Sequence, residues 1–332
     1  MEQLKTFRKI VQHINKEEFS EAINLQRQLL RASTKGTNIL YRFRPANNYT
    51  IEEINTGKMH CSHPRKFNDS FDSNFGQGIN NFIIALFTAM ISGKISVDDT
   101  VKSKSIQIST MQAIRNAINS LVSTKTNIDD SEWLFSYLEN YAKQLDDADV
   151  INEINTFRTL MQDAHTNIND KINDTFLVSC LTTVDYFNQL MWSHYADKEQ
   201  GICIAYDFSN EKYFQDHASI LPIIYSTKRP QIPWKDCILH SDNPKTIYAN
   251  ILEGLITKSK AWDDEQEWRV IMPKTDDQKF EMPPIKCIYL GTKIEDAYKK
   301  EVIKHAKAKS IPVKQMKIDS TTYDLHAVHF DI

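Results

Sequence analysis

Glycine is scarce in this sequence, and the glycine-rich turns that hold phosphate groups are missing. The chain has 8 Gly among 332 residues, and it contains neither a GxGxxG pattern nor a GxxxxGK pattern followed by Ser or Thr. These patterns form the phosphate-binding turns of dinucleotide-binding folds and of P-loops. The sequence therefore encodes neither of these two nucleotide-binding elements.

Cysteine pairs, long apolar runs and a strong net charge are also missing. The 5 cysteines are an odd number without a CxxC pair, which is typical of reduced thiols in the cytosol. The longest apolar run, residues 82–91, is interrupted by Thr88 and is shorter than the about 20 residues that cross a bilayer. The N-terminus lacks the basic and then apolar order of a signal peptide, and a net charge of -3 provides no general nucleic-acid-binding surface. The sequence therefore predicts a cytoplasmic protein without a membrane part.

The apolar pattern predicts an α+β fold with a mixed or antiparallel β core, N-terminal helices and a helical insertion. Apolar residues recur at helical spacing in residues 1–36, and strand-like segments occupy residues 37–78 and 174–332. Residues 79–173 contain no Pro and one Gly, and their apolar spacing is that of amphipathic helices. Because helices do not alternate regularly with strands, the pattern favours an α+β fold over a doubly wound sheet.

Residues 262–272, with the sequence WDDEQEWRVIM, bring three ionisable side chains onto one predicted strand. Alternate residues of a strand share a face, so Glu265, Glu267 and Arg269 are expected to point the same way. Trp268 begins the apolar set on the opposite face, which belongs on a core. The predicted charged face offers two carboxylates and a guanidinium to whatever lies over the sheet.

A predicted helix near residues 189–197 carries an aromatic cluster. Trp192, His194 and Tyr195 could stack on a planar ring and bind a sugar or a phosphate. A buried aromatic helix with one hydrogen-bonded histidine would explain the same residues, and for this segment taken alone it is the favoured interpretation.

Two arginines, Arg42 and Arg44, share one face of the strand predicted at residues 39–44. A guanidinium on a central strand must be paired. The partner is either a structural carboxylate, Glu265 or Glu267, or the phosphate or ribose of a ligand. The sequence leaves both alternatives open.

His60, Cys61 and His63 are a group of possible metal ligands at close spacing. A structural zinc site needs a fourth ligand at a compatible spacing, and the sequence has no second cluster of Cys and His. No metal is therefore expected here. Arg65 and Lys66, which follow directly, could hold a phosphate instead.

Several short motifs, in this order, resemble the bacterial domain of unknown function 2971. They are LYRF at 40–43, FND at 67–69, SC at 179–180, MWSHYAD at 191–197 with Gly201, and WxxExExR at 262–269. The resemblance covers about residues 38–295. Ser70 departs from the family's pattern, in which proline usually follows Asn-Asp.

The same segments are similar to those of ADP-ribosyltransferases. That group places an Arg or His on a first strand, a hydroxyl-rich strand in the middle, and a Glu, often in Glu-x-Glu, before a late strand. The resemblance implies that NAD is the substrate. Arg42 would bind its ribose or diphosphate. Ser179, with Thr182 and Thr183 nearby, would hold the nicotinamide ribose and support the active-site Glu267.

Both glutamates and the aromatic helix also receive roles from this resemblance. Glu267 would stabilise the oxocarbenium-like centre as nicotinamide leaves, and Glu265 would orient or deprotonate the acceptor. Tyr195 or Trp192 would stack on nicotinamide. Further residues expected to contact NAD are Arg44, His194 and Arg269.

The expected acceptor is a macromolecule, either protein or nucleic acid, and the protein could be a toxin or a phage-defence effector with an antitoxin or another partner protein. Two other interpretations stay open. One is a non-enzymatic module that binds a nucleotide or a partner. The other is a nucleic-acid processing enzyme whose acidic residues bind Mg²⁺.

Overall fold

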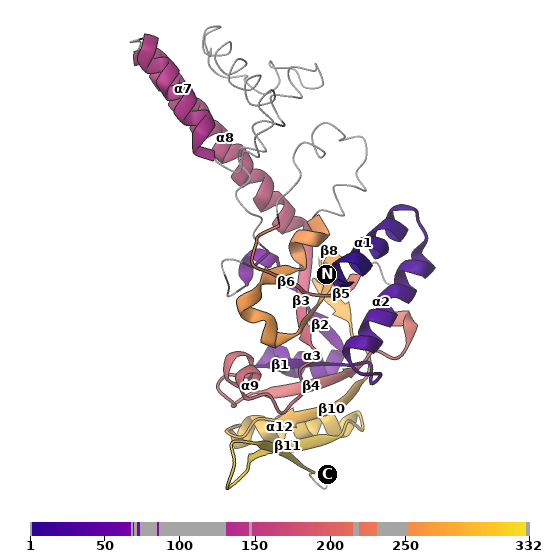
Figure 1. Ribbon diagram of the computed structural model, residues 1–332. Coiled ribbons are helices and arrows are strands. Elements are labelled where there is room, and N and C mark those ends of the chain that lie inside the picture. The colour runs from indigo at the N-terminus through magenta and orange to yellow at the C-terminus, as the bar shows by residue number, and fades with distance from the viewer. Residues whose placement is uncertain are drawn as a thin grey trace. The chain divides into compact units, whose positions relative to one another are not determined.

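The computed structural model describes residues 2–67, 69, 72–73, 85, 131–145, 148–214, 219–230 and 251–329. The elements labelled in Figure 1 include α1 (Glu2–Asn15), α2 (Phe19–Ser33), β1 (Ile39–Arg44), α3 (Asn48–Thr56), β2 (Lys58–His60), α7 (Ser131–Leu145), α8 (Ala148–Thr175), β3 (Phe176–Thr182), α9 (Gln189–Tyr195), β4 (Ile202–Asp207), β5 (Ser219–Pro222), β6 (Ile224–Ser226), β8 (Glu267–Pro273), β10 (Ile285–Leu290), α12 (Asp296–Ala308) and β11 (Val313–Ile318). The remaining strands are β7 (Thr257–Ser259), β9 (Lys279–Glu281) and β12 (Leu325–His329), and short 3-10 helices are η1 (Pro64–Lys66), η2 (Glu211–Phe214) and η3 (Lys260–Glu265).

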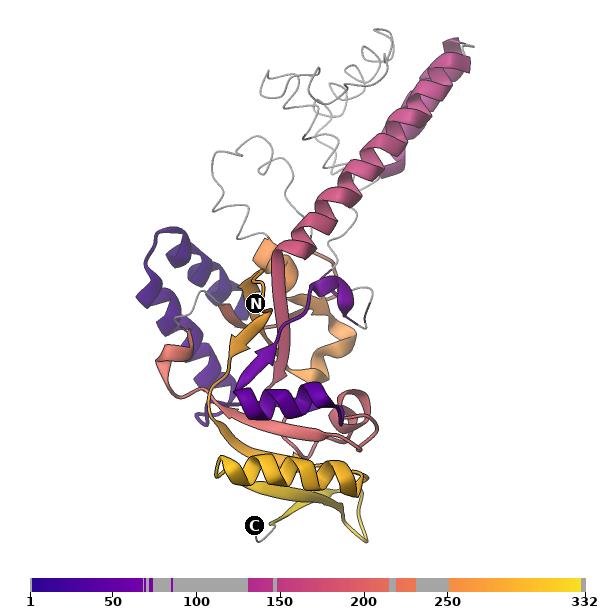
Figure 2. The ribbon, with the colours of Figure 1, turned by 180° about the vertical axis from the view of Figure 1, so that it is seen from behind.

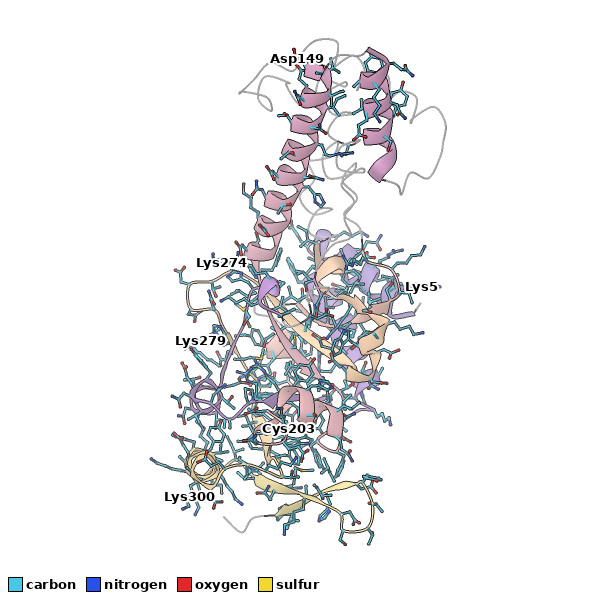
Figure 3. All side chains as sticks on the ribbon, turned by 90° about the vertical axis from the view of Figure 1, so that its left-hand side faces the viewer. Lys5, Asp149, Cys203, Lys274, Lys279 and Lys300 are labelled. Atoms are coloured by element: carbon cyan, nitrogen blue, oxygen red, sulfur yellow. The ribbon has the colours of Figure 1, made fainter. Side chains whose placement is uncertain are left out.

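The chain divides into two compact units. Unit 1 comprises residues 1–72, 174–228 and 256–332, and unit 2 comprises residues 73–173 and 229–255. In unit 2, α7 and α8 lie side by side (Figure 3), and Arg158 of α8 forms an ion pair with Glu139 of α7 at 3.0 Å. Residues 79–84 and 86–130 lie outside the described residues, so the helical insertion at 79–173 stays a prediction in its full extent. None of the helices in the described ranges is long and apolar enough to cross a membrane.

Unit 1 is built on an eight-stranded mixed sheet with the strand order β12-β11-β10-β4-β1-β3-β8-β5. Neighbouring strands are antiparallel except for β10 and β11, which are parallel. Two smaller sheets pair β2 with β9 and β6 with β7. The α+β class, the mixed sheet and the N-terminal helices are therefore confirmed.

Each face of the sheet carries its own apolar cluster. On one face, Trp268 of β8 belongs to the same cluster as Leu30 of α2, Ile54 of α3 and Val302 of α12. Figure 2 shows α3 and α12 on this side of the sheet. On the other face, Trp192 of α9 packs in a second cluster. The helices thus fix which strand residues are buried and which side of each strand is available to a site.

The segment around Glu265 differs from the predicted strand. The strand β8 begins at Glu267, whereas Glu265 ends the 3-10 helix η3. The two elements are joined by Gln266, which has a φ of 43° in the left-handed region. A backbone at positive φ interrupts the alternation of a strand, so the shared-face prediction is wrong for Glu265. It is confirmed for Glu267 and Arg269, which are hydrogen-bonded to each other.

The central strands β1 and β3 part soon after they meet. β1 pairs with β4 along its whole length, from Ile39 to Arg44. With β3, by contrast, the structure shows pairing at one position, between Tyr41 and Thr182. Farther along β3, Val178 exchanges backbone hydrogen bonds of 2.8 and 2.9 Å with Ser62. Between these two positions the sheet opens, and the opening is where the candidate site lies.

Replacing Trp268 by alanine should destabilise the protein by about 3–5 kcal/mol, because the indole is 2% exposed and its removal leaves a cavity in the larger cluster. Chemical denaturation followed by circular dichroism measures this loss. Tyr323→Ala is the control, since that side chain is 91% exposed and its loss should change stability by no more than about 0.5 kcal/mol. Equal effects of the two substitutions would contradict the packing described above.

Candidate functional site

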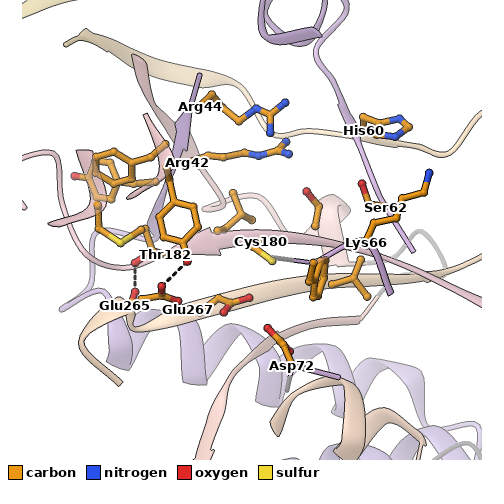
Figure 4. A pocket seen from close by; sticks show the side chains of 18 of the residues that line it. Arg42, Arg44, His60, Ser62, Lys66, Asp72, Cys180, Thr182, Glu265 and Glu267 are labelled. Atoms are coloured by element: carbon orange, nitrogen blue, oxygen red, sulfur yellow. Dashed lines mark hydrogen bonds between the residues drawn. The ribbon is translucent and has the colours of Figure 1, made fainter. Parts of the chain in front are cut away.

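A pocket of about 540 Å³ occupies the opening between β1 and β3. This size lies within the range of small-molecule sites. The lining residues come from β1, α3, the segment 60–72, β3, α9, β7 and the η3–β8 segment, all within unit 1. In Figure 4, Arg42 and Arg44 lie on one side of the pocket and Glu265 and Glu267 on the other, with Cys180 between them. The two sides are called the cationic wall (Arg42, Arg44, His60 and Lys66) and the acidic wall (Glu265, Glu267, Asp72, Lys258 and Tyr195).

The acidic wall is organised around Glu267, the first residue of β8. One carboxylate oxygen accepts a hydrogen bond of 2.7 Å from Nε of Arg269, and the other accepts one of 2.9 Å from Nζ of Lys258. The Arg269 side chain is fully buried and also donates to Asp72 at 2.5 Å. The backbone N–H of Glu267 donates to the hydroxyl of Tyr225 at 2.8 Å.

These cations decide the protonation state of Glu267. Burial alone would raise the pKa of this carboxyl, but Arg269 and Lys258 outweigh burial and lower the pKa to about 2. Burial would lower the pKa of Lys258, yet the neighbouring glutamates raise it above its ordinary value. Glu267 is therefore ionised and Lys258 protonated at neutral pH.

Glu265 lies beside this ion pair and faces the pocket from η3. It accepts hydrogen bonds from the hydroxyl of Tyr195 and, at 2.6 Å, from Nζ of Lys258. Burial and the bond to Glu265 raise the pKa of Tyr195 above its ordinary value, so this phenol stays protonated. The hydroxyl of Thr182 donates to the backbone carbonyl of Glu265 at 2.5 Å and ties η3 to the end of β3. Glu265 thus presents its carboxylate to the pocket, and this carboxylate is held by Tyr195 and by Lys258.

The cationic wall is fixed from beneath by Glu53 of α3. Arg42 donates to this carboxylate at 2.8 Å, and the hydroxyl of Tyr206 donates to it at 2.6 Å. The structural partner of Arg42 is therefore Glu53, rather than Glu265 or Glu267. Arg44 lies 3.7 Å from the same carboxylate. Burial and the neighbouring Arg42 lower the pKa of Arg44 to about 10, so it remains a cation at neutral pH.

The structure brings six of the nine residues proposed from the sequence into the lining of this pocket. They are Arg42, Arg44, Ser179, Tyr195, Glu265 and Glu267. The other three do not line it. Trp192 is 1% exposed and donates its indole N–H to the backbone of Tyr186 at 2.8 Å. His194 lies edge-on to Trp262, and Arg269 lies behind Glu267.

The hydroxyl-rich strand presents a different side chain to Glu267 from the one expected. Ser179 is in register with Val270, which belongs to the apolar face of β8. Cys180 is in register with Arg269 and lies on the face of Glu267. Burial, and after it the charge of Glu267, raises the pKa of the Cys180 thiol well above its ordinary value. The group beside Glu267 is thus a neutral thiol.

Several lining residues escaped the sequence argument. Lys258 stands on the three-residue strand β7 between Thr257 and Ser259, where no periodicity singles it out. Asp72 lies in the segment after η1, and its contact with Arg269 joins residues 197 positions apart. Lys66 was considered for phosphate binding, and it does line the pocket. Strand parity could have identified Cys180, because it fixes which residue of β3 faces Glu267.

Within the described part of the chain, no group of three or more His, Cys, Asp or Glu side chains is arranged to hold a metal ion. Asp72, Glu265 and Glu267 approach one another, but Lys258 and Arg269 occupy the space between their oxygens.

Replacing Glu267 by glutamine should cost about 3–5 kcal/mol of stability at pH 7, since it leaves Lys258 and Arg269 buried with less compensation. The folded-state pKa of about 2 lies below the ordinary 4.5, so this stabilisation is complete above about pH 4.5 and is lost as pH falls toward 2. Urea unfolding of both proteins from pH 7 downward measures it. The difference in the free energy of unfolding between the wild-type protein and Glu267→Gln should become smaller below pH 4.5. Glu211→Gln, which removes an exposed partner of Arg27, should show no such dependence, and a gap that is constant with pH would contradict the assignment.

The family model described as protein of unknown function (DUF2971) matches residues 191–270. No curated protein and no solved structure matches the chain. The matched segment includes four residues of the acidic wall, Tyr195, Lys258, Glu265 and Glu267. The similarity to ADP-ribosyltransferases stays a hypothesis. Residues 191–270 are therefore similar to the DUF2971 family, and this similarity covers most of the acidic wall.

Proposed function

We propose that the pocket between β1 and β3 binds NAD and that the protein transfers ADP-ribose from it to a macromolecular acceptor, a protein or a nucleic acid. One observation carries the proposal. The three segments that resemble ADP-ribosyltransferases, with Arg42, Ser179 and Glu267, are on the neighbouring strands β1, β3 and β8, and all three line one pocket. The meeting of these three residues at one cavity supports the proposal.

The reaction fits the groups of the acidic wall. The bond between C1′ of the ribose and the nicotinamide nitrogen breaks, and its electron pair neutralises the positive ring of the leaving nicotinamide. The ribose becomes an oxocarbenium-like centre, which the ionised Glu267 stabilises electrostatically. The acceptor attacks C1′ and loses a proton, for which Glu265 is the candidate base. With water as the acceptor, the products are free ADP-ribose and nicotinamide.

The cationic wall suits the other end of the ligand. Arg44 and Lys66 supply positive charge, and His60 lies beside them in the lining. Because Arg42 is already paired with Glu53, Arg44 is the better candidate for direct contact with the diphosphate. Tyr49 is 69% exposed and also lines this side, where an aromatic ring can stack on a base.

A cytoplasmic location fits this proposal. The cysteines that the structure describes, Cys61, Cys180, Cys203 and Cys287, are all free. Thiols persist in this state in a reducing compartment. A toxin or phage-defence effector, with an antitoxin as its partner, would act on acceptors in the same compartment.

A binding module without catalysis is the second candidate. One observation favours it, namely that both carboxylate oxygens of Glu267 are already engaged by Arg269 and Lys258. A fully compensated carboxylate is also what a purely structural ion network contains. Such a module would bind NAD or another nucleotide and release no nicotinamide.

Release of nicotinamide from labelled NAD, with and without cell-extract acceptors, separates the two candidates. The wild-type protein should turn NAD over, and Glu267→Gln should lose about 10²–10³ in rate, because one preorganised electrostatic contact is removed. Glu265→Gln should reduce transfer to an acceptor more than hydrolysis. Each variant is assayed at a temperature at which circular dichroism shows it folded. Wild-type protein that binds NAD without turnover would support the module, and full activity in Glu267→Gln would place the chemistry elsewhere.

Removing positive charge from the cationic wall should weaken binding of ADP-ribose. Arg44→Met should raise the Kd by about 10- to 100-fold, since hydrogen bonds to charged groups are worth about 1.5–3 kcal/mol. Titration calorimetry measures this, and Lys66→Met should act in the same direction. Arg27→Met is the matched control, because Arg27 pairs with Glu211 on the exposed surface and does not line the pocket. An unchanged Kd in Arg44→Met would show that the diphosphate lies elsewhere.

A further inference from the structure

Lys258 occupies a central place in the acidic wall. Its ammonium lies 2.6 Å from Glu265, 2.9 Å from Glu267 and 3.8 Å from Asp72. The side chain is 6% exposed, and its charge lies 5.1 Å from the centre of the Trp262 ring. One lysine therefore joins two carboxylates that come from different elements, η3 and β8.

Glu265 and Glu267 would otherwise repel each other. Two carboxylates that share a site need a cation between them to offset this repulsion. Arg269 compensates Glu267 and Asp72. Among the residues that the structure describes, Lys258 is the cation whose ammonium donates hydrogen bonds to both Glu265 and Glu267.

The other groups that face this pair come from several elements. They are Asp72 of the segment after η1, Cys180 of β3, Tyr195 of α9, Tyr225 of β6 and Arg269 of β8. Tyr195 and Cys180 are held neutral, and Tyr225 also has a raised pKa through burial. Charge compensation of the glutamate pair thus depends on Lys258 and Arg269.

We propose that Lys258 is a positioning residue, whose ammonium bridges the carboxylates of Glu265 and Glu267 and holds them side by side so that both address one ribose. This inference deepens the proposed function and rests on it. Lys258 neither donates to the acceptor nor binds the diphosphate. It acts through the two carboxylates, and its location on β7 couples the small β6–β7 sheet to the start of β8.

The first test does not depend on turnover. The Glu267 carboxyl is followed by NMR in protein labelled with ¹³C at the glutamate carboxyls, and its signal is assigned by its loss in Glu267→Gln. Between pH 3 and 7 the wild-type signal should not titrate. In Lys258→Met the midpoint should move up by about 1–3 pH units, the usual effect of one nearby opposite charge, and enter this range. In Lys258→Arg, which keeps the positive charge, the midpoint of the Glu267 titration should move less than in Lys258→Met. A Glu267 signal that stays flat in Lys258→Met overturns the inference.

The second test uses the pH dependence of nicotinamide release. In Lys258→Met the acidic limb should move to higher pH and kcat should fall, with KM little changed. Lys293→Met is the matched control, because it removes an exposed lysine that pairs with Glu199 and does not line the pocket. A lower melting temperature with an unmoved profile would show a merely structural lysine. A raised KM with an unmoved profile would show a ligand-binding one. Either result overturns the inference, whereas wild-type protein inert toward NAD refutes the proposed function and leaves the titration as the deciding measurement.

Discussion

The burial of Glu267 is the constraint on which the acidic wall depends. A lone carboxylate that is 5% exposed would be protonated or would destabilise the fold. Lys258 and Arg269 prevent this, and Arg269 in turn requires Asp72. Three separate chain segments, namely β7, β8 and the segment after η1, therefore have to meet before this charge is tolerated. Each charged group of this set is thus held by a partner from another element, the kind of preorganisation that the proposed electrostatic role of Glu267 requires.

The second constraint is the opening of the sheet. A continuous sheet would pair β1 with β3 along their whole length and leave no cavity. Instead, β3 pairs with Tyr41 of β1 at Thr182, and with Ser62 at Val178. The pocket fills the interval between these points, so residues from both faces of the sheet reach it. This explains how Arg42 and Glu267 line one cavity although strand parity puts their side chains on opposite faces.

Local pattern predicted much of the fold, because alternation and helical spacing report burial directly. The strand 39–44, the helices before it and the shared face of Glu267 and Arg269 all follow from it. Single backbone conformations and pairings between distant residues, by contrast, leave no local pattern in the sequence. The positive φ of Gln266 removed Glu265 from the strand. The pairing of Arg42 with Glu53 depends on how α3 packs beneath β1, which no local pattern contains.

The distribution of charge in the pocket supports one orientation of the proposed substrate. On the acidic wall, three carboxylates face Lys258 and Arg269, which leaves a surplus of one negative charge. On the cationic wall, Arg42 and Arg44 approach the single carboxylate of Glu53, and Lys66 adds a further positive charge to the lining, which leaves a positive surplus. The charges of NAD are complementary to these walls, because its nicotinamide ring is positive and its diphosphate is negative. The ring and its ribose are therefore expected at Glu265 and Glu267. In the proposed reaction the positive charge moves from the ring onto the ribose as nicotinamide leaves, closer to the carboxylates. The wall would therefore stabilise the transition state of that reaction more than the bound substrate.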